Sequence, residues 1–243
     1  MLTLYQMPLS HYCEKARWAL ARKRLPVKCK NWLPGLHIKP AKRLSGQTAL
    51  PILKDGPQVI AGSAAILDHL DARYPRFPLS AATADEDRTR ERALEAYADE
   101  HLGPAVRLLA YSALLDRPDL LIPMMNYEGP WYGQWLMKRA FPRVREALVN
   151  RYHVNEQGVA EAKIAVHKAL DYFAGQRQEN AFFIGGQFGR ADLSIASLLA
   201  PLYMPSAYGA PWPASPPLAC HQLAEEFADW RPWVEGMYQR YRK

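Results

Sequence analysis

The sequence has few cysteines, and none lies close to another. Cys13, Cys29 and Cys220 are the three cysteines in 243 residues. An odd number of widely spaced cysteines is unlike a disulfide framework, so we expect free thiols and a reducing, cytoplasmic compartment. The seven histidines are scattered too, and neither a Cys-x-x-Cys nor a His-x-x-x-His motif occurs. We therefore expect no metal site.

Long apolar runs are also missing. No stretch approaches the roughly 18 apolar residues that a membrane-spanning helix needs, and no charged segment followed by an apolar one opens the chain. Met1 leads directly into the strand-like Leu2-Thr3-Leu4-Tyr5. Apolar residues make up 49% and charged residues 23% of the chain, which is ordinary for a globular protein. We expect two modest domains and no membrane partner.

Acidic residues are scarce in the first third of the chain. Residues 1–80 hold 13 Lys and Arg against 4 Asp and Glu, whereas the remainder holds 18 against 20. A basic domain can indicate nucleic-acid binding, but no nucleic-acid motif accompanies the Arg22-Lys23-Arg24 cluster. We expect no nucleic-acid partner, because an anionic small ligand suits this charge better.

Residues 1–76 follow a mixed strand and helix pattern. Residues 1–6 read as a strand. A helix is expected from His11 to Arg24, with Glu14, Lys15, Arg17, Arg22 and Lys23 facing solvent. A second strand follows over 26–32, and residues 33–47 read as irregular because Pro34, Gly35, Pro40 and Gly46 interrupt them.

The stretch from Thr48 to Leu70 completes this first domain. Pro51 stands before an apolar strand, Asp55-Gly56 predicts a tight turn, and residues 58–61 return as the paired strand. Ser63 precedes apolar residues at helical spacing and is expected to be a helix N-cap. The resulting β-α-β, β-β-α order is the thioredoxin-like pattern.

The rest of the chain lacks strand patterns. Two prolines and no periodicity mark residues 74–83 as a linker, and residues 84–243 read as an all-helical domain. Gly189 and Asp192 resemble a capping box, with Asp192 reaching back to the N-cap N–H. Residues 201–217, rich in proline and aromatic residues, are expected to cover a pocket. A last helix, or a pair broken near Pro232, ends the chain.

The residues around Pro51 and Ser63 suggest a binding site. The N–H groups at a helix N-terminus can hold a carboxylate. A cis bond between Leu50 and Pro51 would leave the Leu50 backbone free to pair with a peptide-like ligand. The alternative is that Ser63 only caps its helix and that the proline bond is trans.

The stretches 2–20, 48–70 and 182–196 together resemble the glutathione S-transferase family. The resemblance implies an α/β thioredoxin-like N-terminal domain, an all-α C-terminal domain and glutathione as co-substrate. It implies a glutathione-binding role for Leu50, Pro51, Gly62 and Ser63, after the family's cis-proline and its pair of acidic residue and serine. Gly62 departs from the family, which usually carries Glu, Asp or Gln there, so we expect weak glutathione binding.

The resemblance also assigns the chemistry. Ser10 follows the first strand and precedes the first helix, where it would stabilise the glutathione thiolate by a hydrogen bond and the helix dipole. Cys13 is the alternative active residue, since a thiol in a first helical turn can have a lowered pKa. The resemblance implies that one of His37, Lys39 and Lys42 meets the glycyl carboxylate of glutathione; spacing does not decide which, and we name Lys39 as the candidate. Asp99 is a candidate for its γ-glutamyl ammonium group.

We therefore expect a homodimeric glutathione transferase that joins glutathione to a small apolar electrophile. A glutathione-dependent thiol reductase using Cys13 and a non-catalytic binding protein are the alternatives. The electrophile pocket is expected to contain four aromatic residues, Tyr111, Trp131, Tyr208 and Trp212.

Overall fold

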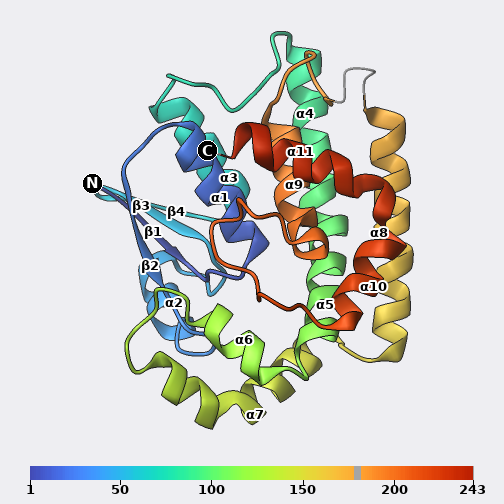
Figure 1. Cartoon of the computed structure of the whole chain (residues 1–243). Coiled ribbons are helices and arrows are strands. Elements are labelled where there is room, and N and C mark those ends of the chain that lie inside the picture. The colour runs from blue at the N-terminus through green and yellow to red at the C-terminus, as the bar shows by residue number, and fades with distance from the viewer. Residues whose placement is uncertain (178–181, 243) are drawn as a thin grey trace.

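A four-stranded mixed sheet forms the first part of the computed structural model, which describes residues 1–177 and 182–242. Its order is β2-β1-β3-β4, with β1 parallel to β2 and antiparallel to β3, and β3 antiparallel to β4. Helices α1, α2 and α3 connect and flank these strands (Figure 1). The bounds are β1 Leu2–Gln6, α1 His11–Arg22, β2 Val27–Asn31, α2 Ile38–Ser45, β3 Ile52–Asp55, β4 Gln58–Ala61 and α3 Ser63–Arg73.

Helix α2 occupies part of the stretch that the sequence pattern marked as irregular. Pro40 lies in its first turn, where a missing N–H removes no helical hydrogen bond. Gly46 ends the helix as its C-cap, with φ +79° and its N–H donating to the Lys42 carbonyl. The two residues that looked like interruptions therefore fit one short helix.

The start of α3 also differs from expectation. Gly62, with φ +96°, is the N-cap, and Ser63 is the first helical residue. In the preceding hairpin Asp55 pairs with Gln58, so the turn consists of Gly56 and Pro57 rather than Asp55 and Gly56.

Helices make up the second part of the chain, beginning with α4 at Asp85. A π-helical segment, η1, joins α4 and α5, and α7 and α8 are the longest helices among the described residues. The bounds are α4 Asp85–Tyr97, η1 Ala98–Leu102, α5 Gly103–Leu114, α6 Pro118–Met125, α7 Gly133–Tyr152, α8 Glu156–Gln176, α9 Arg190–Tyr203, α10 Leu218–Glu226, η2 Ala228–Trp230 and α11 Arg231–Tyr241. The break between the last two helices falls at Phe227, while Pro232 lies in the first turn of α11.

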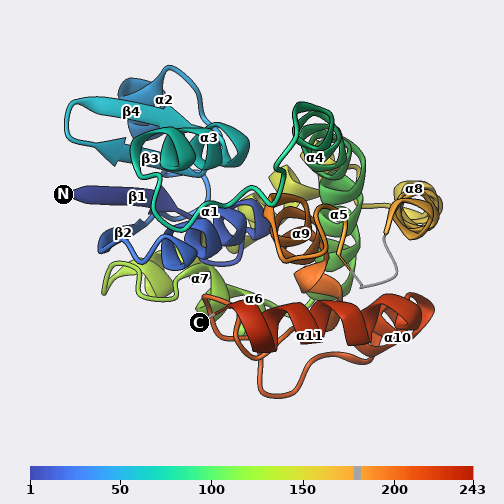
Figure 2. The ribbon, with the colours of Figure 1, turned by 90° about the horizontal axis from the view of Figure 1, so that it is seen from above.

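Helix α9 is the centre of the molecule. Every one of its 14 residues is buried, and a helix enclosed on all sides must be apolar or internally paired around its whole circumference. Helix α1 lies between the sheet and α9 in both views (Figure 2). The packing of α1 on α9 therefore joins the two parts of the chain.

The N-terminus of α9 carries the predicted contact from Asp192. Its carboxylate accepts from the Gly189 N–H at 2.9 Å and from the Phe183 N–H at 3.3 Å. Because Gly189 has no side chain, only this half of a capping box forms. Burial raises the pKa of Asp192 to about 7, although both N–H donors oppose the rise.

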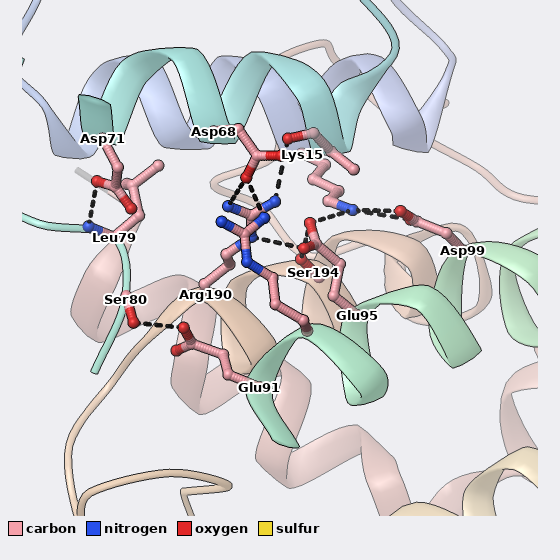
Figure 3. Close-up of polar contacts among 12 residues, drawn as sticks. Lys15, Asp68, Asp71, Leu79, Ser80, Glu91, Glu95, Asp99, Arg190 and Ser194 are labelled. Atoms are coloured by element: carbon pink, nitrogen blue, oxygen red, sulfur yellow. Dashed lines mark hydrogen bonds and ion pairs between the residues drawn. The ribbon is translucent and has the colours of Figure 1, made fainter. Parts of the chain in front are cut away.

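Charged residues of α1 are buried, contrary to the expectation that they face solvent. Lys15 is fully buried and its ammonium lies 2.8 Å from Glu95 and 2.7 Å from Asp99. Arg190 of α9 continues the network, 2.5 Å from Glu95 and 2.5 Å from Asp68 (Figure 3). Burial alone would raise the pKa of Glu95, but Lys15 and Arg190 lower it below its usual range.

A second buried network lies on another face of α1. Glu14, fully buried, accepts from Arg17 and Arg242 at 2.7 Å each and from the Gly209 N–H at 3.1 Å. It attaches the loop before α10 and the end of the chain to the first helix. Helix α1 is thus held by ion pairs on two sides.

We expect Arg190→Met to destabilise the fold strongly, because it removes a cation from buried Glu95. Breaking a buried pair typically costs about 3–5 kcal/mol. The matched control is Arg145→Met, whose partner is Asp116 and whose side chain is 46% exposed; a surface pair of this kind contributes about 0–1 kcal/mol. Urea denaturation at pH 7 measures both, and equal small losses would contradict the assignment of Arg190 as a central contact.

Candidate functional site

A cavity of about 530 Å³ lies where the first domain meets α5 and α7. The first domain contributes the turn before α1 and the segments before α2 and β3, and the helical part contributes one face each of α5 and α7. Its volume is within the range of small-molecule sites. Its lining includes Ser10, His11, Tyr12, His37, Leu50, Arg107, Tyr111, Arg143, Arg151, Tyr152 and Trp212.

Ser10 lies on the wall of this cavity as the N-cap of α1. Its Oγ accepts from the Cys13 N–H at 3.4 Å, and its own N–H donates to the Met7 carbonyl at 3.1 Å. The hydroxyl uses an oxygen lone pair in the cap, so its proton can be donated to a ligand. An anion there would also face the positive end of the helix dipole.

Cys13 is enclosed in the core. Its side chain is 0% exposed and is not part of the cavity wall. Burial raises the pKa of its thiol, although Arg17 and the Ser10 hydroxyl act in the opposite direction. A thiol in this setting stays protonated and out of contact with solutes.

The Leu50–Pro51 bond is cis, as predicted. Leu50 lines the cavity, and no described residue hydrogen-bonds its backbone N–H or carbonyl. The Gly62 N–H donates to the Pro51 carbonyl at 2.9 Å, which brings the start of α3 beside this bond. Ser63 is buried, and neither it nor Gly62 forms part of the cavity wall.

The basic candidates near α2 divide into two sets. His37 lines the cavity just before the helix begins, whereas Lys39 and Lys42 are exposed on α2 and lie outside the wall. Burial and the nearby charge of Arg151 lower the pKa of His37, although its contact with the Leu33 carbonyl opposes this. Asp99, the candidate for an ammonium group, is occupied by Lys15.

Two of the four aromatic residues expected in the pocket line the cavity. Tyr111 packs against Tyr152 with ring centroids 5.5 Å apart, and Trp212 contributes from the loop after α9. Trp131 is instead 94% exposed, since it lies in the turn before α7 and points away from the protein. Tyr208 is buried against Trp212 and donates to the Leu9 carbonyl at 3.1 Å, so it supports the wall from behind.

Sequence reasoning missed the cationic residues of the cavity. Arg143 and Arg151 lie eight residues apart on α7, and eight residues span just over two helical turns, so both reach the same face. The spacing predicts that the two side chains share a helix face, but only the structure shows that this face lines the cavity. Arg107 of α5 gave no such signal.

His11 and Arg107 form the polar part of the inner wall. His11 is 3% exposed, and its Nε2 has no hydrogen-bond partner among the described residues. Burial lowers its pKa to about 3, and the charge of Arg107 acts in the same direction. The ring is therefore neutral at pH 7.

Two features are absent from residues 1–177 and 182–242. No group of His, Cys, Asp and Glu is arranged to hold a metal ion. No helix is both long and apolar enough to cross a membrane.

Comparison with known families agrees with this architecture. The glutathione S-transferase N-terminal domain matches residues 4–79, and the glutathione S-transferase C-terminal domain matches residues 123–215. The chain belongs to the glutathione S-transferase family, and its fold is the predicted one, a thioredoxin-like domain followed by a helical domain. No curated protein matches the sequence significantly.

Solved structures share the fold at low sequence identity. Glutathione transferase F7 from Populus trichocarpa has a TM-score of 0.67 at 14% identity, over 100% of this chain and 95% of that one. A glutathione S-transferase from Rhodospirillum rubrum has a TM-score of 0.63 at 20% identity, over 98% of this chain and 86% of that one. Glutathione S-transferase I, solved with lactoylglutathione, has a TM-score of 0.64 at 15% identity, over 99% of this chain and 95% of that one.

We expect one of the three thiols to react rapidly with Ellman's reagent in the folded protein. Cys29 is exposed, whereas Cys13 and Cys220 are buried. The other two should react only after unfolding, and Cys29→Ser should abolish the rapid reaction. A second rapid thiol that persists in Cys220→Ser would mean that Cys13 is accessible after all.

His11 should make stability fall as the pH is lowered. Its folded pKa of about 3 lies below the ordinary value of 6.5, so the unfolded chain binds the proton first. The loss begins near pH 6.5 and reaches about 2 kcal/mol at pH 5. The free energy of unfolding, measured by urea denaturation between pH 7 and pH 5, should fall less steeply with decreasing pH for His11→Gln than for wild type. The exposed control His221→Gln should keep the wild-type slope, and equal slopes in all three proteins would refute the assignment.

Proposed function

We propose that the protein is a glutathione transferase in which Ser10 stabilises the glutathione thiolate for attack on a small electrophile. The observation that carries the proposal is the position of Ser10, which caps α1 on the wall of the cavity that Leu50 also lines. Members of this family bind glutathione. The Leu50 backbone, which no described residue hydrogen-bonds, suits a peptide-like ligand of this kind.

In the proposed reaction the thiol of glutathione loses its proton to solvent, and the Ser10 O–H donates a hydrogen bond to the sulfur anion. The dipole of α1 favours the same charge. The sulfur then forms a bond to an electrophilic carbon, and the leaving group departs with its electron pair. The apolar side chains of α5 and α7 would hold the electrophile close to the sulfur.

The alternative chemistry through Cys13 has less support. A reductase thiol must reach the sulfur of its substrate, and Cys13 is buried with a raised pKa. The three free cysteines favour the reducing, cytoplasmic location that belongs to this proposal. A homodimer also remains part of it.

Gly62 bears on how tightly glutathione binds. Its φ of +96° suits glycine, and a glutamate there would be strained even though open space surrounds the Cβ position. Introducing the family's usual side chain is thus no clean test of glutathione binding, because the backbone strain would itself disturb the start of α3. We expect weak glutathione binding, because Gly62 lacks the side chain that would supply one charge-assisted hydrogen bond. Such a bond contributes about 1.5–3 kcal/mol.

We expect Ser10→Ala to lower kcat for a standard aryl halide about 100- to 1000-fold, as loss of a donor to an anion does elsewhere. The apparent pKa of bound glutathione, measured by thiolate absorbance, should rise. Ser10→Asp separates chemistry from folding, because aspartate is a good N-cap but has no proton to donate.

Cys13→Ala is the control for the other chemistry and should leave the thiolate pKa and kcat nearly unchanged. An effect of Cys13→Ala together with full activity of both Ser10 variants would favour the reductase. Activity that survives all three substitutions would sink the Ser10 mechanism, whereas the absence of both conjugation and disulfide reduction in the wild type would favour a non-catalytic binding protein.

A further inference from the structure

The charged residues on the cavity wall are all cationic. Arg107, Arg143 and Arg151 line it, and none of the described Asp and Glu residues does. All three arginines come from the helical part of the chain, in which acidic residues slightly outnumber basic ones. Among the described residues, no carboxylate forms an ion pair with any of the three arginines, although Glu146 lies on the same helix as two of them.

Arg107 occupies the inner wall. Its guanidinium carbon lies 4.3 Å from the centroid of the Tyr152 ring and 5.9 Å from that of Tyr12. Its Nε is buried and has no hydrogen-bond partner among the described residues. Arg107 as a whole is half-buried. The two rings stabilise its charge only in part, because a guanidinium partly removed from water is normally paired with an anion or hydrogen-bonded.

His11 gives a second, independent sign of a ligand. Its side chain is nine-tenths or more buried, it lines the same cavity as Arg107, and its Nε2 has no partner. A neutral imidazole can carry its proton on Nε2 and donate to an acceptor. A carboxylate on this wall would lie beside the His11 ring and beside the Arg107 guanidinium, whose terminal N–H groups form no hydrogen bond or ion pair with a described residue.

From these contacts we infer that the electrophile of this enzyme is an anion, an apolar molecule bearing a carboxylate or similar acidic group that Arg107 and His11 bind. This inference deepens the proposed function and rests on the cavity being the electrophile site. Arg107 is then the residue that selects acidic over neutral substrates. Arg143 and Arg151, which are exposed on α7, would attract the anion towards the cavity.

Glutathione is also anionic, so the arginines must be divided between the two ligands. The charge of Arg151 lowers the pKa of His37, near the segment where the glycyl carboxylate is expected. The charge of Arg107 instead lowers the pKa of His11, and its guanidinium packs against the Tyr152 ring on the helical side. Arg107, and not the two arginines of α7, therefore binds the acidic group of the electrophile.

The test compares two ligands of nearly equal shape, naphthalene-2-carboxylate and naphthalene-2-carboxamide. Isothermal titration calorimetry on the full chain at pH 7 should find the carboxylate bound about tenfold or more tightly, because a charge-assisted hydrogen bond is about twice as strong as a neutral one. Arg107→Gln should remove this preference and Arg107→Lys should restore part of it. The control Arg145→Gln lies outside the cavity and should keep it.

The outcomes are distinct. Equal binding of both ligands by wild type, or an equal loss of both in a folded Arg107→Gln protein, would overturn the inference. A loss of glutathione affinity alone in Arg107→Gln would also overturn it, because Arg107 would then serve the tripeptide. Binding is measured without turnover, so an inactive Ser10 mechanism would leave the preference for the carboxylate intact.

Discussion

The structure depends on the buried ion pairs that fix α1 against α9. Lys15, Glu95 and Arg190 come from three separate helices and satisfy one another where water is absent. Each of these charges alone would be costly to bury, and together they are compatible with the core only in one relative position of the helices. Because Ser10 caps α1, that position also sets where its hydroxyl meets the cavity.

The site combines contributions of different kinds from the two parts of the chain. The first domain supplies groups suited to a peptide thiol, namely the Ser10 hydroxyl and the Leu50 backbone. The helical part supplies an apolar and cationic wall around Arg107 and Tyr111. Under the proposed function, thiolate stabilisation and choice of the second ligand depend mostly on different parts of the chain, and His11 of α1 is the exception.

Much of the fold could be predicted from local patterns. Strands β3 and β4 follow from two apolar runs around a turn, and α1 from its periodicity. The sequence pattern does not predict helix α2, because Pro40 resembles an interruption, whereas a proline in the first turn leaves a helix intact. At Gly62 the error was one residue, because the sequence cannot reveal a φ of +96°.

The sequence by itself determined the four strands of the first domain, the all-helical second part, the family and the position of Ser10 before α1. These depend on neighbours along the chain, whose spacing can be read directly. Only the tertiary structure decided the surroundings of the charges: Lys15 and Glu14 belong to an apparently polar face, yet both are buried. Periodicity reports one packed face of a helix, whereas α1 is packed on two. Its second set of partners, from Glu95 to Arg242, lies far along the chain.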